Sequence, residues 1–196
     1  ITDVNGCKAT SAATVVTVNA LPATPTITAG GPTTFCAGGS VLLTSSVATG
    51  YLWSPGGAIT QAITATASGS YTVEITDANG CKATSAATVV TVNANPTVSV
   101  TPVGPFTFCA GGSQLLTATA AGKAVLLYQW QNGGVNIGGA TASTYSATAT
   151  GAYRCIVTDG NVPACSAASN VVTITVNANP TVSVTPVGPV AFCAGG

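Results

Sequence analysis

The sequence predicts an all-β fold of antiparallel β-sandwiches arranged in tandem. Short stretches rich in Val, Ile and Thr alternate with period two and are separated by clusters of Gly, Pro, Asn and Asp. No segment carries the apolar stripe of a helix, so crossover helices for a parallel sheet are not expected. Long sequence segments also occur more than once, and this repetition indicates a tandem repeat array.

Two long sequence segments that occur twice define the repeats. Ile1–Ala20 returns at Ile75–Ala94 with a single exchange, Val4 for Ala78, and Asn93–Gly112 returns at Asn177–Gly196 with two exchanges. We therefore divide the chain into the C-terminal part of one repeat (1–18), two whole repeats (19–92 and 93–176) and the N-terminal part of another (177–196). The expected whole is a longer tandem array, of which this chain is a piece.

Each repeat has its own series of expected strands. In the first whole repeat they are 24–29, 33–36, 40–46, 51–54, 63–66, 70–77 and 82–92. In the second they are 97–102, 106–109, 113–120, 125–131, 144–148, 152–159 and 166–176. The second repeat adds a hairpin at QNGGVNI, where Asn132 and Gly133 suit a turn that requires positive φ.

Composition excludes several classes of partner. Charged residues make up 4% of the chain, with four Lys plus Arg and four Asp plus Glu, whereas about 25% is usual. So few cations cannot hold a nucleic acid or an anionic membrane surface. There is no apolar run long enough for a transmembrane helix, so membrane insertion is not expected either. The 46% content of hydrophobic residues argues against disorder.

Catalytic, cofactor-binding and metal sites are not expected. The chain has no His, so a Ser or Cys nucleophile lacks its usual base. Without His or a CxxC pair, a zinc site is also disfavoured. Asp3, Asp77 and Asp159 occupy equivalent turns, and one carboxylate in each turn is too few for calcium. We expect these three carboxylates to cap their turns through Asx-type hydrogen bonds.

The aromatic residues are assigned to the cores. Trp53 and Trp130 fall in expected central strands, and Tyr71 and Tyr153 fall at corner positions. A sugar-binding face would instead need exposed Trp or Tyr, and for Tyr51, Tyr128 and Tyr145 the sequence leaves both interpretations open.

The order of these motifs along the chain is similar to that in a known class of repeats. GGSVLLTSS, YLW, SGSYTVEITDANG and a long last strand ending TVVTVN resemble the Ig-like and PKD-like repeats of giant secreted surface proteins of Bacteroidota, of the gliding-adhesin or extracellular-filament type. In the second repeat YQWQNGG supplies Trp130, and AYRCIVTD places Tyr153 two residues before Cys155, the spacing of a tyrosine corner. The resemblance implies tandem immunoglobulin-like sandwiches.

The chain departs from that pattern at the inter-sheet disulfide. The position of the first immunoglobulin cysteine is occupied by Ser45 or Ala118, and Val73 stands where the second repeat has Cys155. The usual disulfide is therefore expected to be missing, and Cys155 is expected to be a buried free thiol.

The other cysteines lie at two kinds of place. Cys36, Cys109 and Cys193 precede a Gly-Gly pair, and Cys7, Cys81 and Cys165 follow a turn. In an immunoglobulin topology these places are at opposite ends of a domain, too far apart for a disulfide within it. We therefore predict a bond between Cys36 and Cys165 of successive repeats, with partners outside this chain for Cys7, Cys81, Cys109 and Cys193. The alternative is pairing within each repeat, Cys36 with Cys81 and Cys109 with Cys165.

These observations predict a structural role. We expect a shaft or stalk segment of an extracellular filament or giant surface adhesin, located at the cell surface, whose partners are neighbouring repeats of the same chain. The near-neutral surface also allows lateral association of rods into fibres. The alternative is a carbohydrate-binding or accessory module of a secreted multidomain enzyme.

Overall fold

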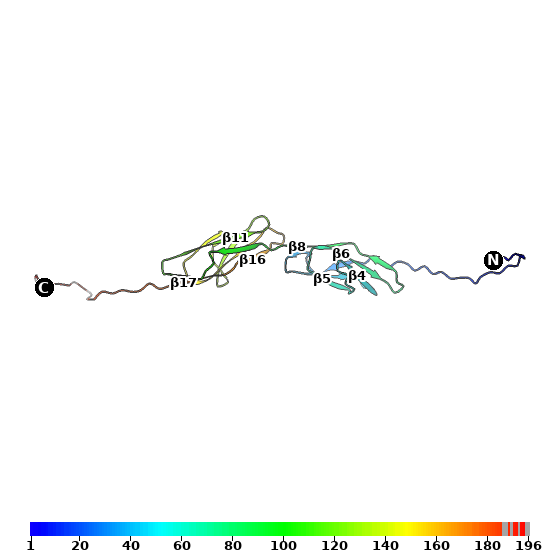
Figure 1. The fold of residues 1–196 in the computed structure, drawn as a ribbon, viewed down its shortest axis with the longest axis horizontal. Helices are drawn as coiled ribbons and strands as arrows, with labels where there is room; N and C mark the ends of the chain where they lie inside the picture. The colour runs from blue at the N-terminus through cyan, green and yellow to red at the C-terminus, as the bar shows by residue number, and fades with distance from the viewer. Residues whose placement is uncertain (186–187, 189, 192, 195–196) are drawn as a thin grey trace. The chain divides into compact units, whose positions relative to one another are not determined.

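A computed structural model describes residues 1–185, 188, 190–191 and 193–194 (Figure 1). The chain divides into two compact units, Ile1–Val92 and Asn93–Gly196, and the division falls at the repeat boundary expected from the sequence. In the described part of the chain all regular secondary structure is β-strand. Each unit is described by itself below.

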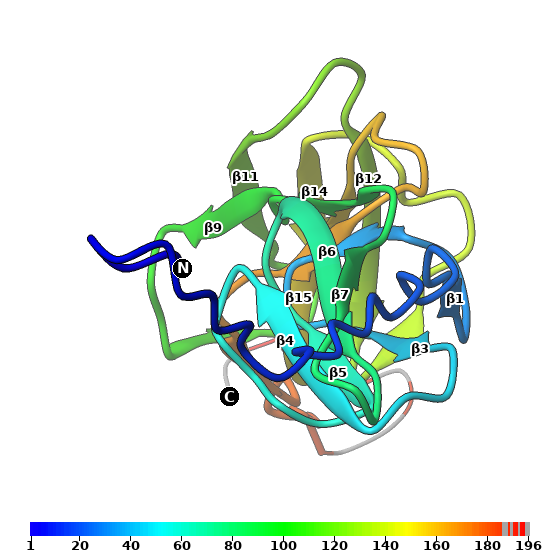
Figure 2. The ribbon, with the colours of Figure 1, turned by 90° about the vertical axis from the view of Figure 1, so that its right-hand side faces the viewer.

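The first unit contains two sheets that enclose one core. One sheet has the order β1 (Ile27–Ala29), β3 (Val41–Ser45) and β5 (Ala62–Ala65). The other has the order β2 (Thr34–Cys36), β8 (Thr88–Asn93), β6 (Gly69–Thr76) and β4 (Gly50–Ser54), with β7 (Lys82–Thr84) also paired to β6. Strands β4, β5 and β6 can also be followed in the turned view of Figure 2.

The core of the first unit follows from the alternation along its strands. In β3 every second residue is buried, and in β6 Tyr71, Val73 and Ile75 point inward while their neighbours are more exposed. Because successive side chains of a strand point to opposite faces, one face of each sheet is apolar. Leu43 and Trp53 come from different sheets and lie in the same buried cluster, so the two sheets form a sandwich.

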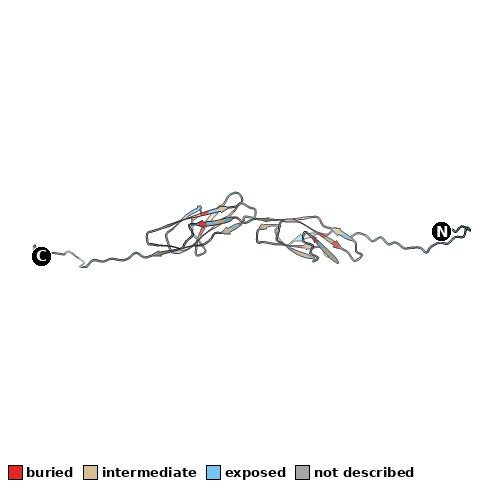
Figure 3. Ribbon diagram, viewed as in Figure 1, coloured by how far each residue is buried: buried red, intermediate tan, exposed pale blue. Residues whose placement is uncertain are grey.

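The second unit repeats this plan. One sheet has the order β14 (Thr144–Ala147), β11 (Gln114–Ala121) and β9 (Thr97–Thr101). The other has the order β10 (Phe106–Cys109), β17 (Val172–Asn177), β15 (Gly151–Thr158), β12 (Leu127–Asn132) and β13 (Val135–Asn136), and β16 (Ser166–Ala168) pairs with β15. Buried residues lie within the two sandwiches (Figure 3).

Strand direction identifies the topology of the second unit. Strand β10 runs parallel to the last strand, β17, with Phe106 opposite Ile174, while the other pairings are antiparallel. The first strand of the unit therefore divides, β9 joining one sheet and β10 the other. Both units are immunoglobulin-like β-sandwiches, and the predicted fold class is confirmed.

The expected last strands, 82–92 and 166–176, are each interrupted, so this part of the strand assignment is wrong. In the first unit Ser85 lies between β7 and β8, where its Oγ accepts a hydrogen bond from the backbone N–H of Val73 at 3.0 Å. In the second unit Ser169 does the same for the N–H of Cys155 at 2.9 Å. A serine side chain that replaces a backbone acceptor breaks the regular ladder at this point.

Two smaller differences concern turns and prolines. The β12–β13 hairpin forms as expected, but its positive-φ residues are Gly133 and Gly134, so the assignment to Asn132 and Gly133 is wrong by one residue. Asn132 is instead the last residue of β12, paired with Val135. Strand β1 begins at Ile27 rather than at residue 24, because Pro25 has no N–H to donate to a ladder.

The predicted partial repeats at the two ends form no sandwich of their own in the described residues. Residues 9–26 contain no strand, and an isolated bridge joins Thr2 to Lys8. Residues 186–187, 189, 192 and 195–196 lie outside the described residues, so the predicted start of a following repeat is described only in part.

Candidate functional site

An aspartate holds the turn that follows β6 in the first unit and β15 in the second. In the first unit Asp77 Oδ1 accepts backbone hydrogen bonds from Asn79 at 2.8 Å and Cys81 at 2.9 Å. Its own N–H donates to the carbonyl of Cys81 at 3.0 Å. Such Asx-type bonds satisfy the N–H groups that a tight turn leaves without partners. The Asp77 side chain therefore fixes the backbone of Cys81, and we call this segment the Asp turn.

The same arrangement recurs at Asp3, where an isolated bridge between Thr2 and Lys8 is the only β-pairing of residues 1–26. Its Oδ1 accepts from the N–H of Asn5 at 3.0 Å and of Cys7 at 2.8 Å. The turn is therefore a local property of the D-x-N-G-C sequence. The expectation that these aspartates cap their turns is confirmed.

The Asp turn of the second unit is longer and buried. Asp159 Oδ1 accepts from the N–H of Cys165 at 3.0 Å and of Asn161 at 3.1 Å, and its Oδ2 accepts from Asn161 Nδ2 at 2.6 Å. Asp159 is 4% exposed and Cys165 is 1% exposed. Burial acts to raise the pKa of Asp159. The backbone donors at Cys165, Asn161 and Lys123, together with the Asn161 amide, outweigh burial and hold the pKa below its ordinary value.

The other kind of cysteine sits in a tight Cys-Ala-Gly-Gly turn. The N–H of Gly112 donates to the carbonyl of Cys109 at 3.0 Å, and the third residue, Gly111, has φ of 94°. This is the residue of the turn that requires positive φ, which glycine adopts without strain. The turn after Cys36 has the same bond, from Gly39 at 2.9 Å, and the same positive φ. We call this segment the Ala-Gly-Gly turn.

The cysteines differ in oxidation state. Cys36 of an Ala-Gly-Gly turn and Cys165 of an Asp turn are disulfide-bonded. The free cysteines of the described chain are Cys7, Cys81, Cys109, Cys155 and Cys193. Disulfides persist in oxidising compartments, so the protein has the character of an extracellular domain. The pairing of Cys36 with Cys165, and of the remaining turn cysteines with other repeats, stays a prediction.

Cys155 has a different environment from the turn cysteines. It is fully buried, and it shares the core of the second unit with Ala118. Burial raises the pKa of the Cys155 thiol, and a backbone hydrogen bond at Gln129 offsets this only in part. A buried thiol of raised pKa is chemically inert at neutral pH.

The aromatic core markers are buried and hydrogen-bonded. Trp53 donates from Nε1 to the carbonyl of Thr60 at 2.8 Å, and Trp130 donates to that of Ala142 at 2.9 Å. The hydroxyl of Tyr153 donates to the carbonyl of Ala149 at 2.8 Å. Tyr71 makes the equivalent bond to Ala67, so both units have a tyrosine corner.

The three tyrosines that the sequence left open have structural positions. The ring of Tyr145 lies between those of Trp130 and Tyr153, at centroid distances of 5.7 and 5.8 Å. Tyr128 packs against the core of the second unit, and Tyr51 packs against that of the first. These rings therefore contribute to packing rather than to an exposed sugar-binding surface.

The segments that enter and leave the second sandwich are hydrogen-bonded to it. At its start, Asn161 Nδ2 donates to the carbonyl of Ala94, and Asn93 Nδ2 donates to that of Val162, both at 3.4 Å. At its end, Asn179 Nδ2 donates to the carbonyl of Ala110 at 3.1 Å. The Asn-Ala-Asn-Pro segments thus contact both the Asp turn and the Ala-Gly-Gly turn of this unit.

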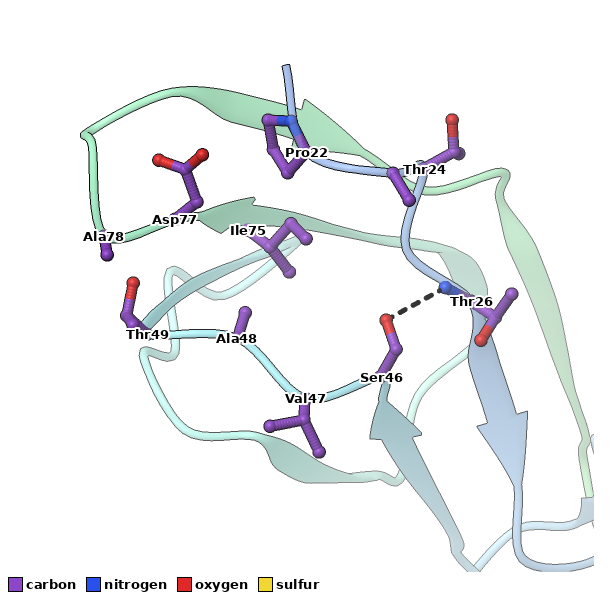
Figure 4. A pocket seen from close by; sticks show the side chains of 11 residues that line it. Pro22, Thr24, Thr26, Ser46, Val47, Ala48, Thr49, Ile75, Asp77 and Ala78 are labelled. Atoms are coloured by element: carbon purple, nitrogen blue, oxygen red, sulfur yellow. Dashed lines mark hydrogen bonds between the residues drawn. The ribbon is translucent and has the colours of Figure 1, made fainter. Parts of the chain in front are cut away.

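A cavity of about 510 Å³ lies beside the Asp turn of the first unit (Figure 4). It is bounded by the segment that enters the unit, by the loop between β3 and β4, and by the Asp turn. Its lining includes Pro22, Thr24, Val47, Ala48, Ile75 and Asp77. Figure 4 shows these mostly small side chains around an open space, and a hydrogen bond from the N–H of Thr26 to Ser46 Oγ at 3.3 Å closes one side.

The second unit fills the corresponding place. Its chain between the core residue Ala118 and Trp130 is longer, and a Cβ placed on Gly122 would lie within 3.4 Å of Pro96, Leu126 and Asp159. The N–H of Gly160 also donates to the carbonyl of Lys123 at 2.9 Å. The loop therefore packs directly against the Asp turn. Because the two loops differ in length, this cavity could not be located from the strand pattern.

Within the described part of the chain, His, Cys, Asp and Glu form no cluster of three or more that could hold a metal ion. A helix long and apolar enough to cross a membrane is likewise missing from the described residues.

Part of the chain matches a known protein family. Residues 98–178 match the model of a family described as a domain of unknown function, DUF8696. This segment covers the second sandwich from β9 to the end of β17. Among curated proteins, none matches the chain.

Several solved structures are similar in fold. The three N-terminal domains of the bacteriophage RB49 highly immunogenic outer capsid protein (Hoc) share 23% identity, with a TM-score of 0.38, covering 77% of this chain and 59% of that structure. The fibronectin(III)-like modules of Clostridium thermocellum CbhA share 21% identity, with a TM-score of 0.35, covering 78% and 95%. The tandem Ig repeats of Dlar share 14%, with a TM-score of 0.37, covering 80% and 99%. The chain thus spans less than two thirds of the capsid-protein structure.

Proposed function

We propose that this chain is a shaft or stalk segment of an extracellular filament or surface adhesin, built from immunoglobulin-like repeats. The observation that carries the proposal is the pair of end turns in each repeat. Both hold a cysteine, and in the second unit both are hydrogen-bonded to the Asn-Ala-Asn-Pro segments beside them. Residues that hold the segments between repeats are expected in an array that resists extension, and an isolated domain does not need them.

The mechanical argument starts from the junction. Pro96 and Pro180 fix φ in the segments that follow Asn95 and Asn179, which restricts bending. Side-chain hydrogen bonds and disulfides at the end turns add further restraint, because each removes freedom from the connecting segment. The length of the projection then grows with the number of repeats.

The surface suits a role in contact with other copies. With charged residues at 4% of the chain, few like charges keep neighbouring rods apart. Lateral association into fibres is consistent with that surface, and attachment at the cell surface is consistent with the disulfide-bonded cysteines. We propose neither catalysis nor nucleic-acid binding.

The proposal is tested by measuring how dimensions grow with repeat number. Chains of two, four and six repeats are compared by small-angle X-ray scattering under oxidising conditions. A maximum dimension that increases by a constant step for each repeat supports a shaft, whereas growth with roughly the square root of repeat number, as in a flexible linker, contradicts it. Addition of a reducing agent to the same samples measures the contribution of the disulfides.

The alternative, a carbohydrate-binding or accessory module, requires an exposed aromatic platform. Trp53 and Trp130 are buried, and the residues that line the cavity of the first unit include no aromatic side chain. Retention of the chain on a glycan array, lost on a substitution in that cavity, would favour the alternative.

A further inference from the structure

The two kinds of turn cysteine form complementary classes. One member of each class, Cys36 and Cys165, is already disulfide-bonded, while Cys81 of an Asp turn and Cys109 of an Ala-Gly-Gly turn are free. We propose that Cys81 and Cys109 are reactive ends through which two copies of this chain join covalently. The bond forms between an Asp turn of one copy and an Ala-Gly-Gly turn of the other. This inference rests on the proposed function, since its partner is another repeat of the same kind.

Local sequence and geometry support equivalence within each class. Phe35–Gly39 and Phe108–Gly112 have the same sequence, FCAGG, and the same turn hydrogen bond and positive φ. Cys81 and Cys165 both donate a backbone N–H to an aspartate carboxylate. The Asp turn of Cys165 is two residues longer than that of Cys81, but in both turns the aspartate holds the cysteine by the same backbone hydrogen bond. A cysteine held by the same contact as a disulfide-bonded one is suited to the same kind of bond.

At the Asp turn of the first unit, the shape of the two turns favours a contact between unlike classes. The Ala-Gly-Gly turn is a small projection, because Ala110 is exposed and Gly111 has no side chain. The Asp turn of the first unit lies beside the cavity of about 510 Å³, and Asp77, which lines this cavity, is hydrogen-bonded to Cys81. We place Ala110 and Gly111 of the second copy in this cavity. Its small aliphatic and hydroxyl side chains fit a tip of that size and polarity.

Accessibility separates these two thiols from Cys155. Cys109 is exposed and Cys81 is partly exposed, whereas Cys155 is buried and its pKa is raised. Thiol–disulfide exchange requires an accessible thiolate, so Cys155 takes no part.

The bond-forming step is thiol–disulfide exchange with a low-molecular-weight disulfide such as oxidised glutathione. The Cys81 thiolate attacks one sulfur of glutathione disulfide, which breaks its S–S bond and releases one glutathione thiolate that takes up a proton. The Cys109 thiolate of the second copy then attacks the Cys81 sulfur of the mixed disulfide and releases the second glutathione. Two protein thiols are oxidised, and one glutathione disulfide is reduced to two glutathione molecules.

The test uses the full chain with Cys7→Ser and Cys193→Ser, so that Cys81 and Cys109 are the accessible free thiols. Two variants are made on this background, one with Cys81→Ser and one with Cys109→Ser. Each is incubated alone and in a mixture with oxidised glutathione, and the products are separated on non-reducing gels. We expect each variant alone to stay monomeric and the mixture to give a heterodimer with a Cys81–Cys109 peptide in mass spectrometry. Homodimers that form as fast as the heterodimer, or no heterodimer at all, would overturn the proposal.

A second comparison tests docking in the cavity. Ala110→Trp is added to the variant that keeps Cys109, and Leu115→Trp, at an exposed position of β11, is its control. We expect Ala110→Trp to slow heterodimer formation by about tenfold, the effect of about 1.4 kcal/mol of lost contact, with no effect of the control. The reaction rate of Cys109 with a small thiol reagent should be the same in both. Equal heterodimer rates for the two Trp variants would show that the cavity does not receive the turn.

A negative result for the Cys81–Cys109 bond can be distinguished from a negative result for the proposed shaft function. Scattering dimensions that grow by a constant step with repeat number, in chains that show no Cys81–Cys109 bond, would leave the proposed function standing and remove only the pairing rule.

Discussion

The Asp159 carboxylate accepts a hydrogen bond from the backbone N–H of Cys165 at 3.0 Å. This bond fixes the backbone of a disulfide-bonded cysteine in the end turn of the second sandwich. The equivalent pair in the first sandwich, Asp77 and Cys81, has the same bond at 2.9 Å. The repeated aspartate, which the sequence predicts as a cap of its turn, therefore also fixes the backbone of the cysteine in that turn.

Asp159 predicts an acid-dependent stability of the second sandwich. Its folded pKa lies below the ordinary value of 3.8, so its ionised form is favoured in the folded state. The stabilisation is present above pH 3.8 and is lost as the pH falls through the folded pKa. Urea unfolding between pH 7 and pH 2, followed by Trp130 fluorescence in a Trp53→Phe background, should show this loss. Asp159→Asn should reduce the dependence, and Asp77→Asn, in the other sandwich, should leave it unchanged.

Removal of the tyrosine hydroxyl at either corner should lower the stability of the sandwich that contains it. Tyr153→Phe removes the hydrogen bond to the carbonyl of Ala149, and Tyr71→Phe removes that to Ala67. Each change should lower the free energy of unfolding of its own sandwich by about 1 kcal/mol, measured by chemical denaturation. A loss in the sandwich that does not carry the substitution would contradict the assignment.

Tyr153 also predicts a loss of stability at alkaline pH. Burial, with a contribution from Tyr145, raises its pKa above 10.0, although the bond to Ala149 opposes this. The unfolded chain then releases the phenolic proton at a lower pH than the folded chain. The stability of the second sandwich should therefore fall as the pH rises above 10.0. This fall should be smaller in Tyr153→Phe than in the unaltered chain.

Replacement of two buried serines in the first sandwich by alanine should change its stability in opposite directions. Ser45 Oγ is buried without a hydrogen-bond partner among the described residues, and the second unit has Ala118 at this position. Ser45→Ala should therefore stabilise the first sandwich by about 1 kcal/mol, because it removes an unsatisfied polar group. Ser85→Ala should destabilise it by about 1 to 3 kcal/mol, because it leaves the N–H of Val73 buried without an acceptor. Thermal melts of both variants measure the difference, and a stabilising Ser85→Ala would contradict the structure.

The thiol of Cys155 should react with thiol reagents only when the second sandwich unfolds. It is fully buried and has a raised pKa, so a thiol reagent at neutral pH should label Cys109 in the native protein and Cys155 only in denaturant. Mass spectrometry of the labelled peptides gives the site. Rapid native labelling of Cys155 would show that the core of the second sandwich opens readily.

The sequence by itself determined the features that depend on residues close together in the chain. Alternating apolar residues predict the strands, D-x-N-G-C forms its turn even at Asp3, where no sandwich surrounds it, and the recurring phrases place the boundary at Asn93. The Trp and Tyr positions follow from the same local patterns.

Only the tertiary structure decided the features that depend on contacts across the sheets. Ser85 and Ser169 interrupt the last strands because their hydroxyls meet an N–H of the neighbouring strand, and strand propensity does not register such a contact. The unsatisfied Ser45 and the cavity beside Asp77 likewise arise from what lies opposite them, since a shorter loop in the first unit leaves open the space that Leu126 and Pro96 approach in the second. Side-chain periodicity predicts which face of a strand is buried. Which groups meet on that face depends on segments far apart in the chain, and folding brings those segments together.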